Sequence, residues 1–587
     1  MRGERRPWAV PTAAVLGSAA LILGPLLRPG YVLSYDMVFA PRMPVGADSV
    51  GLGSGLPRAV PSDLVVAAAT HVLPGDLVQK LVLAGLLVAA GFGAARLTAP
   101  AAVPRTAAAL AYVWTPYLGE RLLLGQWAVL VGYAGLPWLL AAAHRVRSAR
   151  RGERHEVRTA WAWLVVVLGL TCLGGAPAWL LALLTVPFAL GYGLRHEPRA
   201  ALLRLLAGFG ALAVYALPWA VPALTRPGGL GADGAGAEAF APHADTPLGT
   251  VGSVLTGGGI WNAQTVPLGR GAVLPAVAAV VLVGLGLVGV VRRRRDPVIA
   301  ALAGAAVVGL GVVVLTCFAP GARLVGRLPG GALLRDSPRL LAPWLLLIAL
   351  GFAVACAELV RRVSRSAVPA AALLVLLPVA VLPALGWGVS NRLAPVGYPH
   401  DFVQVRALLA ADHRAGAVVV LPFDAYRRFG WNRGGTVLDP MNRWLDRPVI
   451  VSSDLPVARP GDRVLVVRGE DRLAARVAEQ LHTAARDPAD AARLLGSDGA
   501  RWVVVESHSG SRLDRALLAG LVRHYRGPDL SLYEVPARWV RGADDPLRGY
   551  AAPVAGVVWA DAAAGLLLVA GVLTTGLWAV VGPRERR

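Results

Sequence analysis

Acidic and aromatic residues gather in a few polar stretches of an otherwise apolar sequence. Asp36 follows Tyr35 in a stretch that also contains Met37 and Phe39. A carboxylate among such neighbours is partly desolvated, which raises its basicity and suits it to take a proton from a sugar hydroxyl. The alternative is a solvated turn residue without a chemical role. Position in the sequence leaves both interpretations open.

Arginines in the same stretches could bind phosphate. Arg335 and Arg339 enclose Asp336 in the sequence LRDSPR at 334–339, and Arg121 directly follows Glu120. A planar guanidinium can donate two parallel hydrogen bonds to phosphate oxygens. The competing interpretations are a helix cap for Asp336 and ion pairs between helices for Glu120 and Arg121. The candidate donor-phosphate-binding residues are Arg58, Arg121, Arg335 and Arg339.

Aromatic, amide and acidic side chains in these stretches suit carbohydrate. An aromatic face packs against sugar C–H groups, whereas amides and carboxylates bind hydroxyls. The alternatives are an interfacial membrane anchor for Trp127 and an ordinary loop hydrogen bond for His243. The candidate substrate-binding residues are Tyr35, Glu120, Gln126, Trp127, Asp245, Trp261, Asn262 and Asp336.

Long apolar segments must position these stretches. Hydrophobic residues make up 56% of the 587 residues and charged residues only 16%, and the mean hydropathy is +0.56. This composition excludes a disordered chain and argues against an all-soluble protein. About twelve segments approach the roughly 20 apolar residues of a membrane helix. They lie near 9–28, 76–96, 101–118, 125–144, 159–174, 177–194, 200–223, 272–291, 297–317, 339–359, 367–387 and 554–581.

The basic residues predict how the chain crosses the membrane. The sequence has 58 basic and 36 acidic residues, a formal net charge of +22, and the arginines lie between apolar segments rather than on one soluble face. We therefore interpret them as a topology signal and not as a nucleic-acid site. Clusters such as 145–158 and 292–295 follow an even number of crossings. Both termini are thus predicted to be cytoplasmic in the plasma membrane.

The same rule places the longer polar segments on the outer side. These outer segments are the loops 29–75, 224–271 and 318–338 and the domain-sized stretch 388–553. We therefore divide the chain into a transmembrane part at 1–387, an extracytoplasmic domain at 388–553, and a last helix with a basic tail at 554–587.

The segment 388–553 has the pattern of a small α/β domain. Short apolar runs predict strands at 417–421, 463–467, 501–505 and 532–535, and apolar residues every three or four positions predict helices at 471–483, 487–495 and 513–525. The stretch 421–443 carries aromatic, amide and acidic residues. For that stretch we favour docking or acceptor binding over catalysis.

Several competing chemistries have no motif in the sequence. There is no Gly-rich loop ending in Gly-Lys-Ser/Thr, no His-Glu-x-x-His and no Cys-x-x-Cys. Cys172, Cys317 and Cys356 are isolated in or beside apolar stretches, as packing residues are. We therefore predict neither a nucleotide site nor a bound metal.

Together these features resemble the GT-C superfamily of polytopic glycosyltransferases, particularly its actinobacterial arabinofuranosyltransferases. The resemblance rests on Asp36, on YLGER and GQW between 117 and 127, on GGIWN at 258–262, on LRDSPR at 334–339, and on the C-terminal outer domain. It implies an α-helical polytopic fold. It also implies an enzyme of cell-envelope assembly that works in the membrane.

The resemblance further implies inverting transfer of a sugar, arabinofuranose or mannose, from a polyprenyl-phosphate donor to an envelope glycan or glycolipid acceptor. Asp36 would be the general base, and arginine would stabilise the departing phosphate. Many GT-C enzymes have two adjacent acids here, but Met37 follows Asp36. No cofactor is predicted, although a divalent cation remains possible if Asp48, Asp63, Asp76, Glu120 or Asp245 supplies a second carboxylate.

Two other classes of protein fit the same features. A flippase that moves a polyprenyl-linked precursor would also need many spans and basic outer loops, together with a continuous polar path between the helices. A non-catalytic scaffold for envelope assembly would use the outer domain to bind partners. The cavity beside Asp36 should distinguish them from a transferase.

Overall fold

A computed structural model describes most of the chain. The described residues are 6–149, 153–227, 234–328, 330–363, 369, 373–459, 463–487 and 490–581. The basic residues Arg2 and Arg5 and the tail 584–587 lie outside these ranges. The cytoplasmic position of both termini therefore stays a prediction.

The helical part is arranged around α15 (Ala342–Arg362), the most buried of its long apolar helices. α15 packs against α4 (Ala102–Val113), α12 (Val273–Arg292) and α13 (Pro297–Thr316). The backbones of α12 and α15 touch, because a Cβ on Gly289 would lie 1.9 Å from the Gly351 carbonyl oxygen. The sequence directly before α15 is LRDSPR, so this candidate motif is attached to the centre of the bundle.

Within the described residues, eight helices are long and apolar enough to cross a membrane, or nine if a pair bent by 69° counts as one span. The bent pair is Leu374–Val381 with Pro383–Asn391. Helices α9, α12 and α23 leave most of their apolar residues uncovered by protein, as helices that face lipid do. The chain is a multi-pass membrane protein.

Residues 367, 368 and 370–372 of the span predicted at 367–387 lie outside the described residues. The other predicted spans overlap helices, but not all of these helices have the dimensions of a full span, so a count of twelve is not confirmed. α4 has 12 residues and ends before Trp114, and α8 has 17 residues. α7 begins in a charged segment at Arg154. The other helices of the membrane part are α1 (Arg6–Leu23), α2 (Ser62–Thr70), α3 (Gly75–Arg96), α5 (Pro116–Leu123), α6 (Trp127–Ser148), α7 (Arg154–Cys172), α8 (Gly175–Gly191), α9 (Pro198–Thr225), α10 (Gly234–Ala239), α11 (Gly249–Leu255), α14 (Ala319–Arg327), α17 (Leu377–Val381), α18 (Gly386–Asn391) and α23 (Val554–Val581).

The segment 388–553 contains a five-stranded sheet of order β4-β1-β7-β9-β8. β1 runs parallel to β4 and β7, whereas β9 runs antiparallel to β7 and β8. Alternate residues of β1 belong to the hydrophobic cores on the two faces of the sheet. Val419 packs with α21 and α22, and Val418 packs with α19 and the membrane part. The elements are α19 (His400–Ala411), α20 (Met441–Trp444), α21 (Arg472–Ala484), α22 (Ala491–Ser497), β1 (Ala417–Leu421), β2 (Tyr426–Arg428), β3 (Thr436–Leu438), β4 (Val449–Ile450), β5 (Leu455–Arg459), β6 (Arg463–Val467), β7 (Ala500–Glu506), β8 (Val522–Arg526) and β9 (Leu530–Glu534).

The four predicted strands correspond to β1, β6, β7 and β9, but the helix predicted at 513–525 is wrong. A 3-10 turn at Arg515–Leu518 is followed by β8, which pairs with β9 at the sheet edge. Leu517 and its apolar neighbours gave the helical spacing, yet they pack beneath the sheet from this single turn. Strand pairing outweighs local periodicity there.

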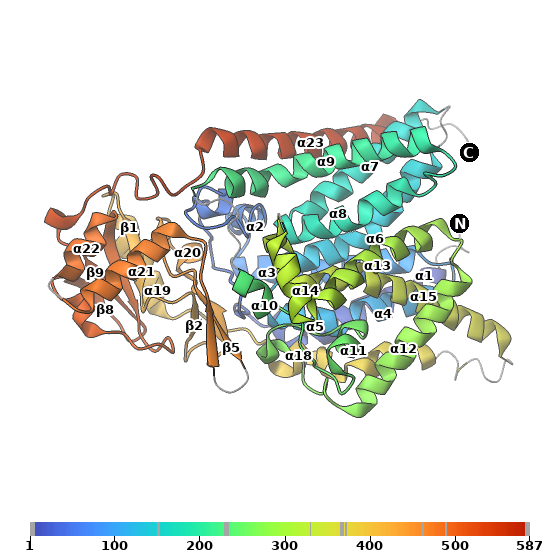
Figure 1. The fold of residues 1–587 in the computed structure, drawn as a ribbon, viewed down its shortest axis with the longest axis horizontal. Coiled ribbons are helices and arrows are strands. Elements are labelled where there is room, and N and C mark those ends of the chain that lie inside the picture. The colour runs from blue at the N-terminus through green and yellow to red at the C-terminus, as the bar shows by residue number, and fades with distance from the viewer. Residues whose placement is uncertain are drawn as a thin grey trace.

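The α/β domain lies at one end of the helical bundle, and α23 runs back along α7 and α9 (Figure 1). Three outer loops contact this domain. In the loop 29–75, Asp36 bonds to Tyr426 of the domain. In the loop 224–271, Phe240 packs against the β5–β6 hairpin, and in the loop 318–338, Arg335 bonds to Glu470. All three loops therefore share one end of the bundle with the domain.

The contact between α12 and α15 makes a prediction about stability. Gly289→Ala should lower stability by about 1–3 kcal/mol, because overpacking against a backbone forces two helices apart. Gly284→Ala on the same helix is the matched control, since no atom lies within 4 Å of its added Cβ. Thermal unfolding in lipid nanodiscs measures both variants. Equal melting temperatures for the two variants would contradict the close packing.

Candidate active site

Asp36 lies in a tight turn that is fixed to the loop between α5 and α6. The Asp36 amide donates to the Leu124 carbonyl at 3.2 Å, and the Ser34 hydroxyl donates to the Leu123 carbonyl at 2.5 Å. Gly125 has φ +74°, and a Cβ there would lie 2.1 Å from the Ser34 carbonyl oxygen. Glycine is therefore required where the two segments meet.

The Asp36 carboxylate faces the α/β domain. Its Oδ1 accepts a hydrogen bond from the Tyr426 hydroxyl at 2.7 Å, and its side chain is partly exposed. Desolvation raises the pKa of Asp36 above its usual value, and the negative charge of Asp336 raises it further. The Tyr426 hydrogen bond and the charges of Arg58 and Arg443 offset part of this increase in pKa. A carboxylate with a raised pKa is a stronger base than one in water.

Arg121 and Asp336 form a buried ion pair beside this turn. Their side chains are 0% and 4% exposed, and Arg121 Nη1 lies 2.8 Å from Asp336 Oδ2. Gln126 donates to the same oxygen at 3.2 Å, and Arg339 Nη2 lies 3.4 Å from it. Arg339 is also within electrostatic range of Asp36. The structure thus gathers Asp36 and four candidate residues from three segments of the chain.

Arg58 and Arg335 converge on one carboxylate, that of Glu470. Arg335 Nη1 lies 3.2 Å from Glu470 Oε1, and Arg58 pairs with the other carboxylate oxygen. The Arg335 guanidinium also lies 4.7 Å from the ring centroid of Phe240. Burial raises the pKa of Glu470, but Arg58 and Arg335 outweigh burial and hold it below its usual value. Two candidate phosphate ligands therefore share a carboxylate of the α/β domain.

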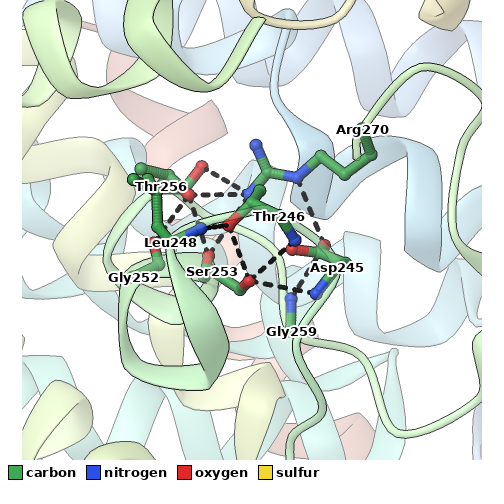
Figure 2. A network of polar contacts seen from close by, with 8 residues as sticks. All are labelled: Asp245, Thr246, Leu248, Gly252, Ser253, Thr256, Gly259 and Arg270. Carbon is green, nitrogen blue, oxygen red and sulfur yellow. Dashed lines mark hydrogen bonds and ion pairs between the residues drawn. The ribbon is translucent and has the colours of Figure 1, made fainter. Parts of the chain in front are cut away.

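Glu120 points to a different cluster from its neighbour Arg121. Figure 2 shows the Arg270 guanidinium between Thr256 and Asp245: its Nε lies 3.2 Å from Asp245 Oδ2, and its Nη2 donates to Thr256 Oγ1 at 2.8 Å. Glu120 is 1% exposed and forms a side-chain hydrogen bond with Asp245. The cluster fastens α5 to the loop 224–271.

The pKa values of the two carboxyl groups in this cluster shift in opposite directions. Burial and the Asp245 charge raise the pKa of Glu120 well above its usual value. Burial also acts on Asp245, but Arg270 outweighs it and lowers the pKa of Asp245. Glu120 is therefore the protonated partner, and Asp245 is the anion that balances Arg270.

Tyr35 and Trp127 flank the Asp36 turn. The Tyr35 hydroxyl donates to Gln264 Oε1 at 2.7 Å, which joins the turn to the loop 224–271. Trp127 begins α6, and its ring centroid lies 5.6 Å from that of Phe39. Both aromatic side chains are partly exposed beside the candidate base.

Trp261 and Asn262 make local contacts in the loop 224–271. The Trp261 ring packs edge-on against Phe240 at 4.6 Å between centroids, in a small core with the β5–β6 hairpin. The Asn262 side chain accepts from the Gln264 amide at 3.0 Å and so caps a 3-10 turn. Trp261 therefore packs the loop against the hairpin, and Asn262 positions Gln264.

A cavity of about 390 Å³ lies between the loop 29–75 and the α/β domain. Tyr426, Arg58 and Arg443, which all act on Asp36, line it. The rest of its wall includes hydroxyl, amide and carboxylate groups, from Ser49, Ser54, Asp48, Asp63, Asn442, Asp446, Ser452, Ser453, Glu470 and Asp471. Its size and polarity suit a small polyhydroxylated ligand.

The described residues contain no group of three or more His, Cys, Asp or Glu side chains arranged to hold a metal ion. The donors nearest to Asp36 are instead a tyrosine hydroxyl and guanidinium groups. These residues do not fit a divalent cation at Asp36, so the chemistry below uses none.

The sequence did not reveal the partners that complete the site. Tyr426 lies in a stretch that we had interpreted as a docking or acceptor surface, and Arg443, Arg270, Gln264 and Glu470 were not candidates. The sequence Tyr-Arg-Arg-Phe at 426–429 combines aromatic and basic residues, but this pattern does not indicate which residue each would contact. Pairs such as Asp36 with Tyr426 are 390 positions apart, beyond any local pattern.

Searches by sequence and by structure give different results. No protein-family model matches the sequence, and no curated protein resembles it significantly. The cryo-EM structure of the arabinofuranosyltransferase AftD from Mycobacteria superposes with a TM-score of 0.58 at 18% identity, covering 90% of this chain and 40% of AftD. A single-residue variant of AftD gives 0.56 at 18% identity, covering 90% and 41%.

The chain has the GT-C fold. This confirms the resemblance that the sequence indicated, and it accounts for the membrane bundle with a C-terminal α/β domain. The chain spans about 40% of the length of AftD, so AftD contains a large region that this chain does not match. At 18% identity the likeness concerns the GT-C fold and leaves the reaction to be argued from the site.

The protonated Glu120 makes a prediction about pH. Because its pKa is raised in the folded protein, its contribution to stability is complete below the ordinary value of 4.5 and is lost as pH rises toward the folded value. Glu120→Gln stays neutral at every pH. The melting temperature of Glu120→Gln should therefore rise relative to that of the wild type as pH increases from about 5 to about 8. Thermal unfolding across this range measures the difference.

Asp245→Asn is the matched control for Glu120→Gln. It leaves the Arg270 guanidinium buried without its anion, which costs roughly 3–5 kcal/mol, so stability should be low throughout this pH range. A constant difference in melting temperature between Glu120→Gln and the wild type would mean that Glu120 is ionised in the folded protein.

Proposed function

We propose that this protein is a membrane glycosyltransferase in which Asp36 is the general base. The observation that carries the proposal is that Asp36 accepts a hydrogen bond from Tyr426, which lines the cavity, and lies within electrostatic range of Arg339. Attack of a hydroxyl on a phosphate-linked sugar requires two groups, a base and a positive charge near the phosphate, and Asp36 and the guanidinium can supply them. The GT-C fold supports the same reaction.

The reaction exchanges one bond at the anomeric carbon for another. An acceptor hydroxyl oxygen attacks that carbon while its proton passes to Asp36. The bond from the carbon to the phosphate oxygen breaks, and the phosphate leaves with the electron pair. Attack on the face opposite the phosphate inverts the anomeric configuration. Phosphate is a competent leaving group, so one base and fixed positive charge suffice.

The donor phosphate would bind at the arginines near the bundle. Arg339 lies within electrostatic range of Asp36, and its side chain is 17% exposed. Arg121 is fully buried and paired with Asp336, so it would act by holding Asp336 and Arg339 in place. Arg58 and Arg335 could contact phosphate if Glu470 releases them.

The acceptor would occupy the cavity between the loop 29–75 and the α/β domain. The hydroxyl, amide and carboxylate groups of its wall can hydrogen-bond a glycan, and Tyr426 connects that wall to Asp36. The donor would then approach from the helices and the acceptor from the domain. We propose a polyprenyl-phosphate donor and an envelope glycan or glycolipid acceptor on the extracytoplasmic side. The likeness to AftD favours arabinofuranose as the sugar over mannose.

The first test removes the base. Asp36→Asn should lower kcat/KM by at least about 100-fold, because the amide cannot take the hydroxyl proton. The assay follows transfer from radiolabelled polyprenyl-phosphate arabinofuranose to envelope glycan acceptors with purified protein. Asp296→Asn is the control, since Asp296 caps α13 far along the chain and asparagine caps equally well. Unchanged transfer by Asp36→Asn would refute its assignment as the base.

The second test concerns the leaving group. Arg339→Gln should lower kcat by roughly 100- to 1,000-fold, because charge on the departing phosphate loses its guanidinium. Asp336 keeps Arg121 as its partner, so the fold should persist. Arg327→Gln, on the exposed face of α14, is the matched control. Equal activity of both variants would place the phosphate elsewhere.

The same assay separates transfer from transport. A flippase would move the labelled donor across proteoliposomes without forming a glycosidic product, and it would be insensitive to Asp36→Asn. A scaffold would do neither.

A further inference from the structure

The hairpin β2–β3 belongs by sequence to the α/β domain but pairs with the Asp36 turn. The Tyr35 amide donates to the Thr436 carbonyl at 2.7 Å, and the Leu438 amide donates to the Tyr35 carbonyl at 2.8 Å. Tyr35 and Val437 form a parallel bridge. The loop 29–75 thus pairs with β3 through Tyr35, the residue directly before Asp36.

Side chains reinforce this pairing. Leu33 and Val38 from the loop form a small core with Phe429 and Val437 of the hairpin. These contacts lie on both sides of Asp36 in the sequence. The orientation of the Asp36 carboxylate is therefore set by the hairpin as well as by the bundle.

A buried charge cluster holds the hairpin to the sheet. Arg427 is fully buried; its Nη2 lies 2.7 Å from Asp439, and its Nε pairs with Glu506 at the end of β7. Its Nη2 also donates to the Pro422 carbonyl at 2.8 Å. Successive residues of a strand point to opposite sides, so fixing Arg427 inward turns Tyr426 outward, toward Asp36.

Tyr426 can only donate to Asp36. Burial and the Asp36 charge raise the pKa of the Tyr426 hydroxyl well above its usual value, so it keeps its proton. The hydrogen bond to Asp36 Oδ1 is 2.7 Å long and stabilises the ionised carboxylate. Oδ2 of Asp36 is then the oxygen left to accept a proton from substrate.

We propose that Tyr426 is a positioning residue for the base, supplied by the α/β domain: it holds Asp36 by one oxygen and keeps the carboxylate ionised for proton transfer. This inference rests on the proposed function, in which Asp36 is the base. It makes the α/β domain part of the active site rather than only a docking or acceptor-binding module.

The pH profile of Tyr426→Phe tests this role. Without the hydrogen bond, Asp36 should protonate more readily. In the pH profile, kcat/KM should therefore fall roughly tenfold more on the acid limb than on the plateau, because one charged hydrogen bond is lost. Tyr398→Phe is the matched control, because the Tyr398 hydroxyl donates to the Phe39 carbonyl at 2.9 Å in the same interface and does not contact Asp36. Its acid limb should coincide with that of the wild type.

A second variant guards against a folding defect. 3-Fluorotyrosine at position 426 has a more acidic hydroxyl and is a stronger donor, so its acid limb should move to lower pH. Acid limbs that coincide for the wild type and both changes at position 426 would overturn the proposal. Asp36→Asn is measured in parallel: if it retained wild-type transfer, the proposed function itself would fail, and the role of Tyr426 would fail with it.

Discussion

The ion pair between Arg121 and Asp336 is the constraint on which the rest of the site depends. Two charges removed from water are stable only with well-placed partners, and here Gln126 and Arg339 provide them. The pair fixes the end of α5, the start of α6 and the segment before α15 relative to one another. The Asp36 turn is hydrogen-bonded to the loop between α5 and α6, so the Arg121–Asp336 pair also determines where this turn lies.

Local patterns predicted the elements that depend on local physics. Hydropathy indicated where the chain enters the membrane, since burial in lipid demands a continuous apolar run whatever the neighbours are. It was less informative at α4, where the run breaks at Trp114 and the chain turns into α5. The strands β1 and β7 were predictable for the same reason, because both are central and nearly all their residues are buried.

Long-range partners could not be predicted. Glu120 and Arg121 are adjacent in the sequence, but successive helix residues point about 100° apart, and each contacts a different loop. Asp336 was interpreted as a possible helix cap, yet its side chain makes no capping hydrogen bond and pairs with Arg121 instead. The residue types were informative, whereas their pairing depends on the tertiary fold.

The pairing of the Asp36 turn with β3 bears on how the chain is made. Translation delivers position 36 early, and the strand that completes its pairing emerges from the ribosome only some four hundred codons later, after most of the membrane helices. The nascent chain must therefore insert its bundle with this turn still unpaired. A protein interrupted before β3 would be embedded in the bilayer, yet its Asp36 turn would lack the strand that it pairs with.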